Sequence, residues 1–243
     1  EQPGSGYAPD QELYSKEELA SIPPLALALS RGCGNPTAFA RIHEGETVVD
    51  IGCGGGIDLI LAGRLVGPSG RVLGVDFAPE MLERARLSAD EASLENIELF
   101  PGDIESLPLP DECADGVVSN CVINLIPDKQ AAYREAFRVL RPEGRIAISD
   151  IVTSSQFEPA LRARLQGTWA GCLGGAMEEG TYLALVEAAG FRDIDVLARH
   201  ILSHEELDAM ARCPGEDFTP APLPEDLAAV AGRVVSIKFS AIK

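Results

Sequence analysis

The sequence predicts an α/β fold in which a mostly parallel sheet carries helices on both faces. Two observations predict it. From residue 46 onward, short apolar runs alternate with helical segments of about ten to 15 residues, the pattern of βαβ units. The runs also show little polar alternation, which is typical of parallel strands that are buried on both faces. The first run, ETVVDIGCGGG, ends in an acid and a glycine turn.

The elements follow in order along the chain. Residues 16–30 are expected to form a short helical approach, and 31–42 a turn that leads into a short helix. Five strands are expected in the runs 46–51, 70–77, 96–104, 114–125 and 145–152, with helices at 57–66, 78–92 and 128–140 and a turn at 141–144. A helical insertion, interrupted near GCLGG, should follow at 156–190. Two further strands, 193–202 and 233–243, are expected to pair antiparallel, with a loop at 212–226 between them.

This order suggests three regions: an N-terminal helical segment at 1–44, a nucleotide-binding core at 45–155, and a substrate side at 156–243.

The composition limits the classes of partner that the chain can bind. A net charge of −18 should repel phosphate backbones, so no nucleic-acid partner is expected. No uncharged apolar run is long enough to span a membrane, and residues 1–15 do not resemble a signal peptide.

Cysteine usage points to the cytoplasm. The six cysteines form no CxxC pair, so free thiols in a reducing compartment are expected. They are Cys33, Cys53, Cys113, Cys121, Cys172 and Cys213.

The glycine turn predicts a nucleotide-like cofactor, and two candidates compete. A dinucleotide site requires a third glycine where Ile57 stands, and Asp58 in the first turn of the helix is poorly placed for a diphosphate. Asp50 suits a cationic ligand instead, and Asp76, at the end of the next strand, suits ribose hydroxyls. S-adenosyl-L-methionine, which carries an ammonium and a sulfonium but no phosphate, is therefore the predicted cofactor.

Four motifs, DIGCGGG, VDFAPEML, GDIESLPLPD and RVLRPEGRIAISD, together resemble those of class I S-adenosylmethionine-dependent methyltransferases over about residues 45–155. The resemblance implies a Rossmann-like, seven-stranded sheet whose last strand is antiparallel. It also implies cofactor contacts, which fall on Gly52, Cys53 and Gly54 for the methionine part, Asp76 and Phe77 for the ribose and ring, and Asp103 and Ile104 for the adenine.

Three further stretches, RGCGNPTAFA, SNCVINLIPDK and WAGCLGGAM, resemble arsenite methyltransferases, and this likeness runs over nearly the whole chain from Tyr14. In that family cysteine thiolates hold trivalent arsenic beside the cofactor's methyl group, which makes arsenic detoxification the implied role. The resemblance makes Cys172 an arsenic ligand, with Cys33 as a second and Cys213 as a further candidate. A thiol reductant such as glutathione or thioredoxin is the implied partner.

The chemistry of such a site is simple. Arsenic bound by soft thiolates keeps a lone pair that can attack the sulfonium methyl, so no general base is needed. Small neighbours such as Gly171, Gly174 and Gly175 would let the site close tightly against the cofactor. Two departures count against it, because Leu59 and Gly232 stand where other family members carry cysteines.

Alternatives remain open for the acceptor. The chain could methylate an organic small molecule, at a quinone-like carbon or a hydroxyl, or could bind the cofactor or arsenic without turnover. Cys172 could pack a tight helix contact, Cys33 could be structural and Cys213 an incidental loop thiol. Cys53 and Cys121 are expected to line the cofactor pocket, and Cys113 to be incidental.

The fourth strand ends in further polar residues. Asn120 is expected to reach the cofactor or the substrate and to order the loop, whereas Asn124, Pro127 and Asp128 could simply form a turn and a helix cap. Trp169 is expected to anchor the inserted helix. The three histidines are read as structural, and they are His43, His200 and His204.

Overall fold

The computed structural model describes residues 13–28, 32–166, 171–211 and 224–243. A seven-stranded sheet crosses the molecule in the order β3-β2-β1-β4-β5-β7-β6. Every pairing is parallel except those of β7, which runs antiparallel to both of its neighbours. The strands are β1 (Thr47–Ile51), β2 (Arg71–Asp76), β3 (Ile97–Pro101), β4 (Ala114–Asn120), β5 (Leu140–Thr153), β6 (Arg192–Ile201) and β7 (Val234–Ile242). The predicted fold class is confirmed.

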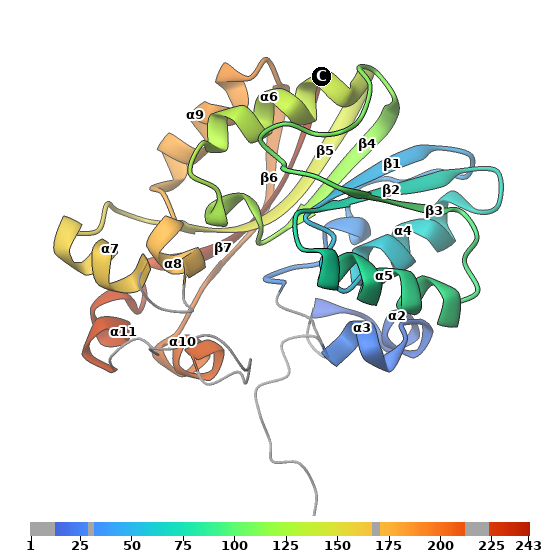
Figure 1. The fold of residues 1–243 in the computed structure, drawn as a ribbon. Helices are drawn as coiled ribbons and strands as arrows, with labels where there is room; N and C mark the ends of the chain where they lie inside the picture. The colour runs from blue at the N-terminus through green and yellow to red at the C-terminus, as the bar shows by residue number, and fades with distance from the viewer. Residues whose placement is uncertain (1–12, 29–31, 167–170, 212–223) are drawn as a thin grey trace, which may run out of the picture.

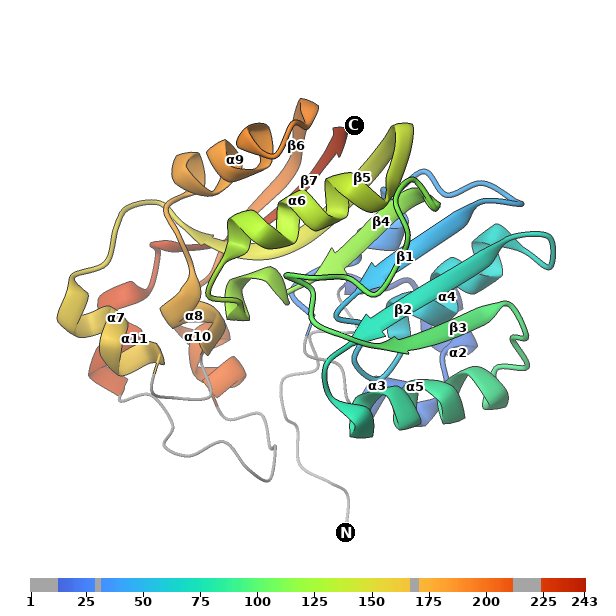
Figure 2. The same cartoon turned by 45° about the horizontal axis from the view of Figure 1, so that its top comes forward.

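Helices cover both faces of this sheet (Figures 1 and 2). Helices α4 and α5 pack on β1, β2 and β3, whereas α6 and α9 pack on β5 and, for α9, on β6. The helices of the core are α4 (Ile57–Val66), α5 (Pro79–Glu91), α6 (Lys129–Val139) and α9 (Glu179–Ala188). The others are α2 (Lys16–Ser21), α3 (Pro24–Ala28), α7 (Pro159–Gln166), α8 (Gly171–Gly175), α10 (His204–Ala211) and α11 (Pro224–Val230), with 3₁₀ turns η1 (Pro36–Ala38) and η2 (Ile123–Leu125).

Strand β1 shows why the central strands are apolar throughout. Successive side chains of a strand point to opposite faces. Val49 and Ile51 pack in the core under α6 and α9, and Val48 packs in the core under α4. Asp50 therefore points to the α4 side, where it is almost completely buried. A carboxylate in such a place requires a functional reason, because burial without a partner is costly.

The N-terminal segment covers the outer side of α4. Tyr14, Ile22 and Ala26 form an apolar cluster with Ile60 and neighbouring residues of α4. Helix α2 begins with a capping box in which Ser15 and Glu18 exchange hydrogen bonds between their side chains and backbone amides. The predicted helical approach is thus confirmed, as two short helices, over the residues described.

One boundary differs from the expectation. The turn predicted at residues 141–144 lies within the bounds of β5. Ala114 pairs with Leu140, but Gly116 pairs with Arg145, so extra residues of β5 are accommodated there as an irregularity. Glu143, with φ of +64°, marks this irregularity.

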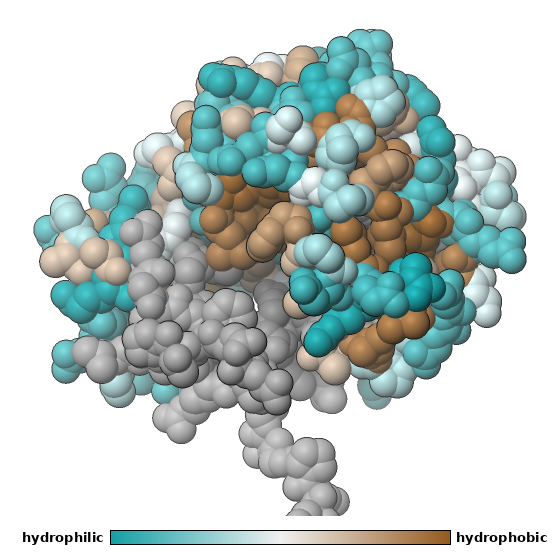
Figure 3. All heavy atoms as spheres, viewed as in Figure 1, coloured by the Kyte–Doolittle hydropathy of each residue, from teal (hydrophilic) through white to brown (hydrophobic). Residues whose placement is uncertain are grey.

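The helical insertion forms a second apolar cluster beyond the carboxyl end of β5. Phe157, Leu165, Leu173 and Leu207 pack there with residues of α11. In Figure 3, apolar surface shows in the middle of the displayed face, and hydrophilic surface predominates around it. Among the described helices, none combines the length and apolarity needed to cross a membrane.

Candidate functional site

The strand order reverses between β1 and β4, and in open α/β sheets ligands bind at the carboxyl ends of the strands beside such a point. The glycine turn lies there. Gly52 has a φ of +73°, and a Cβ on it would lie 2.4 Å from Val122. The amides of Gly52 and Cys53 both donate to the Val75 carbonyl, at 2.8 and 3.1 Å. A Cβ on Gly54 would meet nothing within 4 Å, so the turn presents bare backbone to a ligand.

Three carboxylates surround this turn. Asp76 accepts hydrogen bonds from the amides of Gly54 (2.9 Å) and Ala78 (3.0 Å). Asp50 and Asp58 are both more than nine-tenths buried, yet Oδ2 of Asp50 and Oδ1 of Asp58 have no hydrogen-bond partner among the described residues. Two unpaired acidic oxygens beside bare backbone match the ammonium of S-adenosylmethionine and would repel a diphosphate.

Burial changes the acidity of these groups. It raises the pKa of Asp58 to about 7, and the hydrogen bond from Asn120 opposes that rise. Burial, together with the charges of Asp58 and Asp76, raises the pKa of Asp50 well above its ordinary range. Burial likewise raises the pKa of the Cys53 thiol, which therefore stays protonated and small. A cationic ligand would reverse the cost of ionising the two acids.

Two other predicted cofactor stretches end the neighbouring strands. Phe77 follows β2 with 82% of its surface exposed, an unusual place for an aromatic ring without a ligand. Asp103 and Ile104 follow β3, which pairs in parallel with β2. Asp103 is exposed and caps the local turn through the Glu105 amide, whereas Ile104 is buried. The ring-binding roles of these residues stay predictions.

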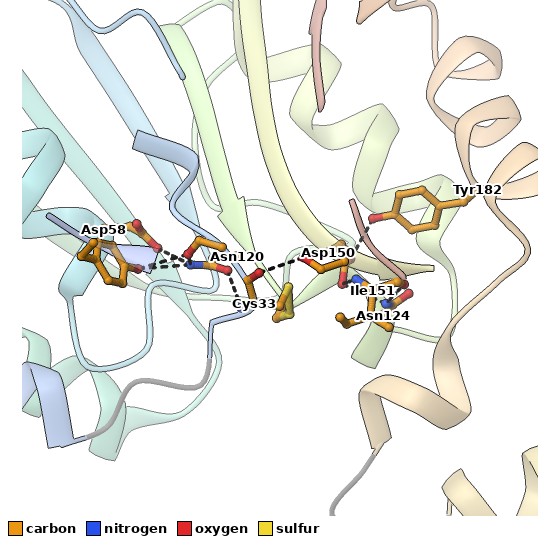
Figure 4. Close-up of a disulfide and its surroundings, with 11 residues drawn as sticks. Cys33, Asp58, Asn120, Asn124, Asp150, Ile151 and Tyr182 are labelled. Carbon is orange, nitrogen blue, oxygen red and sulfur yellow. Dashed lines mark hydrogen bonds between the residues drawn. A yellow bond between two sulfur atoms is a disulfide. The ribbon is translucent and has the colours of Figure 1, made fainter. Parts of the chain in front are cut away.

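Asn120 ends β4 and lies between the carboxylates and the cysteines (Figure 4). Its Oδ1 accepts from the Cys33 amide at 3.1 Å. Its Nδ2 donates to Asp58 Oδ2 at 3.0 Å and to the Gly34 carbonyl at 2.7 Å. Asn120 therefore orders the loop of Cys33, and its predicted contact with the cofactor or the substrate stays a prediction.

The pairing of the cysteines differs from the prediction. Cys33 and Cys121 are joined by a disulfide, although they lie 88 residues apart in sequence, so the expectation of free thiols is wrong for this pair. The physical reason is the sheet: Cys121 directly follows β4, and the segment of Cys33 lies across the same strand end through Asn120. Cys121 also packs in the apolar cluster of the helical insertion, which corrects its assignment to the cofactor pocket. Cys53 and Cys113 are unpaired.

A fully buried acid lies beside the disulfide. An oxygen of Asp150 and the two sulfur atoms of Cys33 and Cys121 lie within 4.8 Å of one another. Tyr182 donates to Asp150 at 2.7 Å, and Asn124 donates to it at 2.8 Å. Burial raises the pKa of Asp150 to about 6, against the lowering effect of the Tyr182 hydrogen bond. Asn124 thus anchors a buried network in addition to forming η2, and Asp128 caps α6 as predicted.

Helix α8 brings the GCLGG stretch to the same place. Its Leu173 packs in the apolar cluster that contains Cys121. A Cβ on Gly175 would lie 2.0 Å from the Asn124 carbonyl oxygen, so only glycine allows α8 to lie this close to η2. Gly175 therefore approaches the backbone of η2 closely, and the expected approach of this stretch to the cofactor stays a prediction. Cys172 belongs to α8, but its side chain, like Trp169 and Cys213, lies outside the described residues.

Comparison with known proteins agrees with this geometry. Residues 42–190 match the family model of the methyltransferase domain, which covers more than half of the chain. The chain belongs to this methyltransferase family. The predicted resemblance to class I S-adenosylmethionine-dependent methyltransferases is thereby confirmed.

Three relatives indicate where this methyltransferase stands. An arsenite methyltransferase of Halobacterium salinarum is 42% identical over 183 residues, which are 75% of this chain and 46% of that protein. The structure of an arsenic(III) S-adenosylmethionine methyltransferase from Chlamydomonas reinhardtii gives a TM-score of 0.75 at 30% identity, covering 99% of this chain and 75% of that one. A demethylmenaquinone methyltransferase of Listeria welshimeri is 37% identical over 110 residues, 45% of this chain and 47% of that protein. The methyltransferase spans about half the length of the curated relatives it matches.

At the two positions where the resemblance implies further cysteines, the chain carries Leu59 and Gly232. Leu59 is fully buried in the core under α4, and a Cβ on Gly74 of β2 would touch it at 2.9 Å. A thiol at residue 59 would therefore lie inside the core. Gly232, with φ of +74°, forms the turn before β7, and its amide donates to Leu202.

The histidines of this methyltransferase take structural places. His43 lies in a turn in which its amide donates to Glu46, and the His200 ring pairs with Glu206 at 2.5 Å. His204 begins α10, whose amide at Glu206 is capped by Ser203. Among the described residues, the group whose geometry could hold a metal ion consists of Cys33, Cys121 and Asp150.

Asp58 gives the methyltransferase a specific pH dependence. The unfolded chain releases this proton near the ordinary pKa of 3.8, and the folded protein releases it near 7. Between these values the folded state binds more protons, so the free energy of unfolding should fall as pH rises, by at most ~1.4 kcal/mol per pH unit for this group. Urea denaturation from pH 4 to pH 8 would measure it.

Asp58→Asn is the matched variant, because it removes the proton but keeps the shape of the side chain. In this variant the free energy of unfolding should fall less steeply between pH 6 and pH 7. This window lies above the pKa of about 6 of Asp150, so Asp150 contributes less to the slope there. An unchanged slope in Asp58→Asn would show that Asp58 ionises normally in the folded protein.

Proposed function

We propose that the chain transfers a methyl group from S-adenosylmethionine to trivalent arsenic, as arsenite or methylarsenite, held by cysteine sulfur. One observation carries the proposal: two cysteine sulfurs from distant segments meet at the carboxyl edge of the sheet, and a single asparagine links them to the carboxylates of the cofactor site. This arrangement supports the proposal, because a soft ligand pair beside a cation site would bring arsenic close to the sulfonium cofactor.

The proposal assigns the cofactor to the turn between β1 and α4. Asp50 and Asp58 would hold its ammonium, Asp76 its ribose hydroxyls, and Phe77 with Asp103 and Ile104 its base. When bound, S-adenosylmethionine would supply an electrophilic methyl group, to which arsenic can donate its lone pair while the bond from the methyl carbon to sulfur breaks. The chain's own contribution is to bring the two reactants together and to exclude water. Proximity and alignment can lower the activation barrier by several kcal/mol.

The thiols must first be free. A dithiol or two monothiols would reduce the Cys33–Cys121 disulfide and leave as a disulfide, which yields two cysteine thiols and consumes no other reagent. Each thiol then displaces one hydroxyl of arsenite as water. Cys172, on the adjacent helix α8, would supply a third sulfur, and Cys213 remains a further candidate ligand. Glutathione or thioredoxin in a reducing cytoplasm would suit this reaction.

An organic acceptor is the second candidate, and the similarity to the Listeria demethylmenaquinone methyltransferase favours it. Asp150, the buried acid beside the disulfide, is a candidate base for such a reaction, but three donors already occupy it. Arsenic explains the paired sulfurs, whereas a quinone-like carbon does not require them.

The test uses the reduced protein with methyl-labelled S-adenosylmethionine, glutathione and arsenite, and separately with a demethylated quinone. Labelled mono- or dimethylarsenicals are expected, and Cys172→Ser should reduce them strongly. Label in the quinone and none in arsenic would replace the proposal by the second candidate. Arsenite binding without any transfer would identify a sequestering protein.

A further inference from the structure

The side chain of Asn120 contacts both the cofactor turn and the loop of Cys33. The amide of Asn120 bonds to the carboxylate of Asp58 on one side and to the backbone of Cys33 on the other, with its oxygen and nitrogen used in opposite directions (Figure 4). Asn120 is also the last residue of β4, and Cys121 directly follows it in the chain. A shift of this side chain would therefore move the Cys33 backbone relative to the cofactor turn.

The two oxygens of the Asp58 carboxylate differ in their partners. Oδ2 accepts from Asn120 Nδ2 at 3.0 Å, and Oδ1 is buried with no partner among the described residues. A cationic group on Oδ1 would keep the carboxylate ionised, and hydrogen bonds to an ionised acceptor are shorter and stronger than neutral ones. Occupation of the cofactor site would thus tighten the bond that holds Asn120 in place.

The loop of Cys33 fits tightly around the same amide. A Cβ on Gly32 would lie 2.4 Å from Asn120 Nδ2, and the Gly34 carbonyl accepts from that nitrogen at 2.7 Å. On the far side, Ser236 of β7 donates to the Cys33 carbonyl at 2.9 Å. The backbone of Cys33 is therefore held from two directions, and the hydrogen bond that its amide donates to Asn120 connects it to the cofactor site.

We propose that Asn120 is a positioning residue that couples cofactor binding to arsenical binding, so that each ligand tightens the other. This proposal rests on the proposed function and goes beyond it, because it assigns an energetic link between the two sites. Coupling of this kind is reciprocal: the cofactor changes arsenical affinity by the same factor as the arsenical changes cofactor affinity.

The experiment measures the dissociation constant of a trivalent phenylarsenical for the reduced full chain by calorimetry. It is measured alone, with saturating S-adenosylhomocysteine, and with saturating methylthioadenosine, which shares the adenosine but lacks the ammonium. S-adenosylhomocysteine should tighten arsenical binding by about fivefold or more. Methylthioadenosine should leave it unchanged, because it places no cation on Asp58.

Two variants locate the link. Asn120→Asp keeps an acceptor for the Cys33 amide but loses the donor to Asp58, so arsenical binding should persist without coupling. Asn96→Ser is the control, because Asn96 also donates to two backbone carbonyls, those of Gly63 and Gly67, but touches neither site. The control should keep the coupling of the parent chain.

The outcomes separate the two proposals. Arsenical binding and methylation that are independent of S-adenosylhomocysteine would overturn the coupling and leave the proposed function intact. Equal coupling by methylthioadenosine, or full coupling in Asn120→Asp, would also overturn it. Absence of arsenical binding to the reduced parent chain would overturn the proposed function itself. The comparison of the two adenosine ligands needs no variant and decides the question even if Asn120→Asp fails to fold.

Discussion

Replacing Cys121 by serine is expected to lower the rate of methyl transfer to arsenite by about 100-fold or more, equivalent to ~2.7 kcal/mol of barrier. The reason is that Cys121 and Cys33 present adjacent sulfurs at the strand edge, and a hydroxyl is a poor ligand for a soft element. Binding of S-adenosylhomocysteine should persist, because the substitution leaves Asp50, Asp58 and the glycine turn of the cofactor site unchanged. Transfer of labelled methyl groups and calorimetry with the phenylarsenical would measure the two effects separately.

Cys113→Ser is the matched control, since Cys113 is an unpaired and half-buried cysteine in a turn before β4. It should keep both activity and arsenical binding. The double variant Cys33→Ser/Cys121→Ser should be no less active than either single one, because the two thiols act as a unit. Normal transfer in Cys121→Ser would remove the thiol pair from the mechanism.

Asp50→Asn is expected to weaken S-adenosylmethionine binding by about 10- to 100-fold, the loss of one hydrogen bond to a charged group worth ~1.5–3 kcal/mol. Asp50 carries a buried carboxyl oxygen with no partner among the described residues, and burial holds its pKa high. Its ionisation therefore has to accompany binding of the ammonium. Calorimetry in buffers of different ionisation enthalpy should show that the parent protein releases protons on binding and that Asp50→Asn releases fewer.

The same change should not destabilise the ligand-free protein, because Asn has the shape of Asp without a charge to bury. The control is Asp90→Asn, on the exposed side of α5, where Asp90 pairs with Arg86. It removes the same charge and should leave cofactor binding unchanged. Unaltered affinity in Asp50→Asn would move the ammonium site to another carboxylate.

Much of the fold could be predicted from the sequence, because the patterns that indicate strands, helices and turns are local. The parallel strands are apolar runs bounded by turns, and each of the helices expected between them begins near the predicted residue. The glycine turn, Asp50 and Asp76 could be placed because they directly follow strands whose ends share one edge. In the sequence, Asp58 indicates that a diphosphate is disfavoured, and an acid in the first turn after the glycines is also a sign of a cation site.

The sequence by itself therefore determined the sheet, the cofactor turn and the family resemblance, since period, spacing and turn residues act over a few neighbouring positions. Only the tertiary structure decided which cysteines meet, that Leu59 faces the core, and that Asn120 links the two halves of the site. These are contacts between segments up to 88 residues apart. Which sulfur reaches which depends on how strand ends and loops pack in three dimensions, and no local pattern encodes that distance.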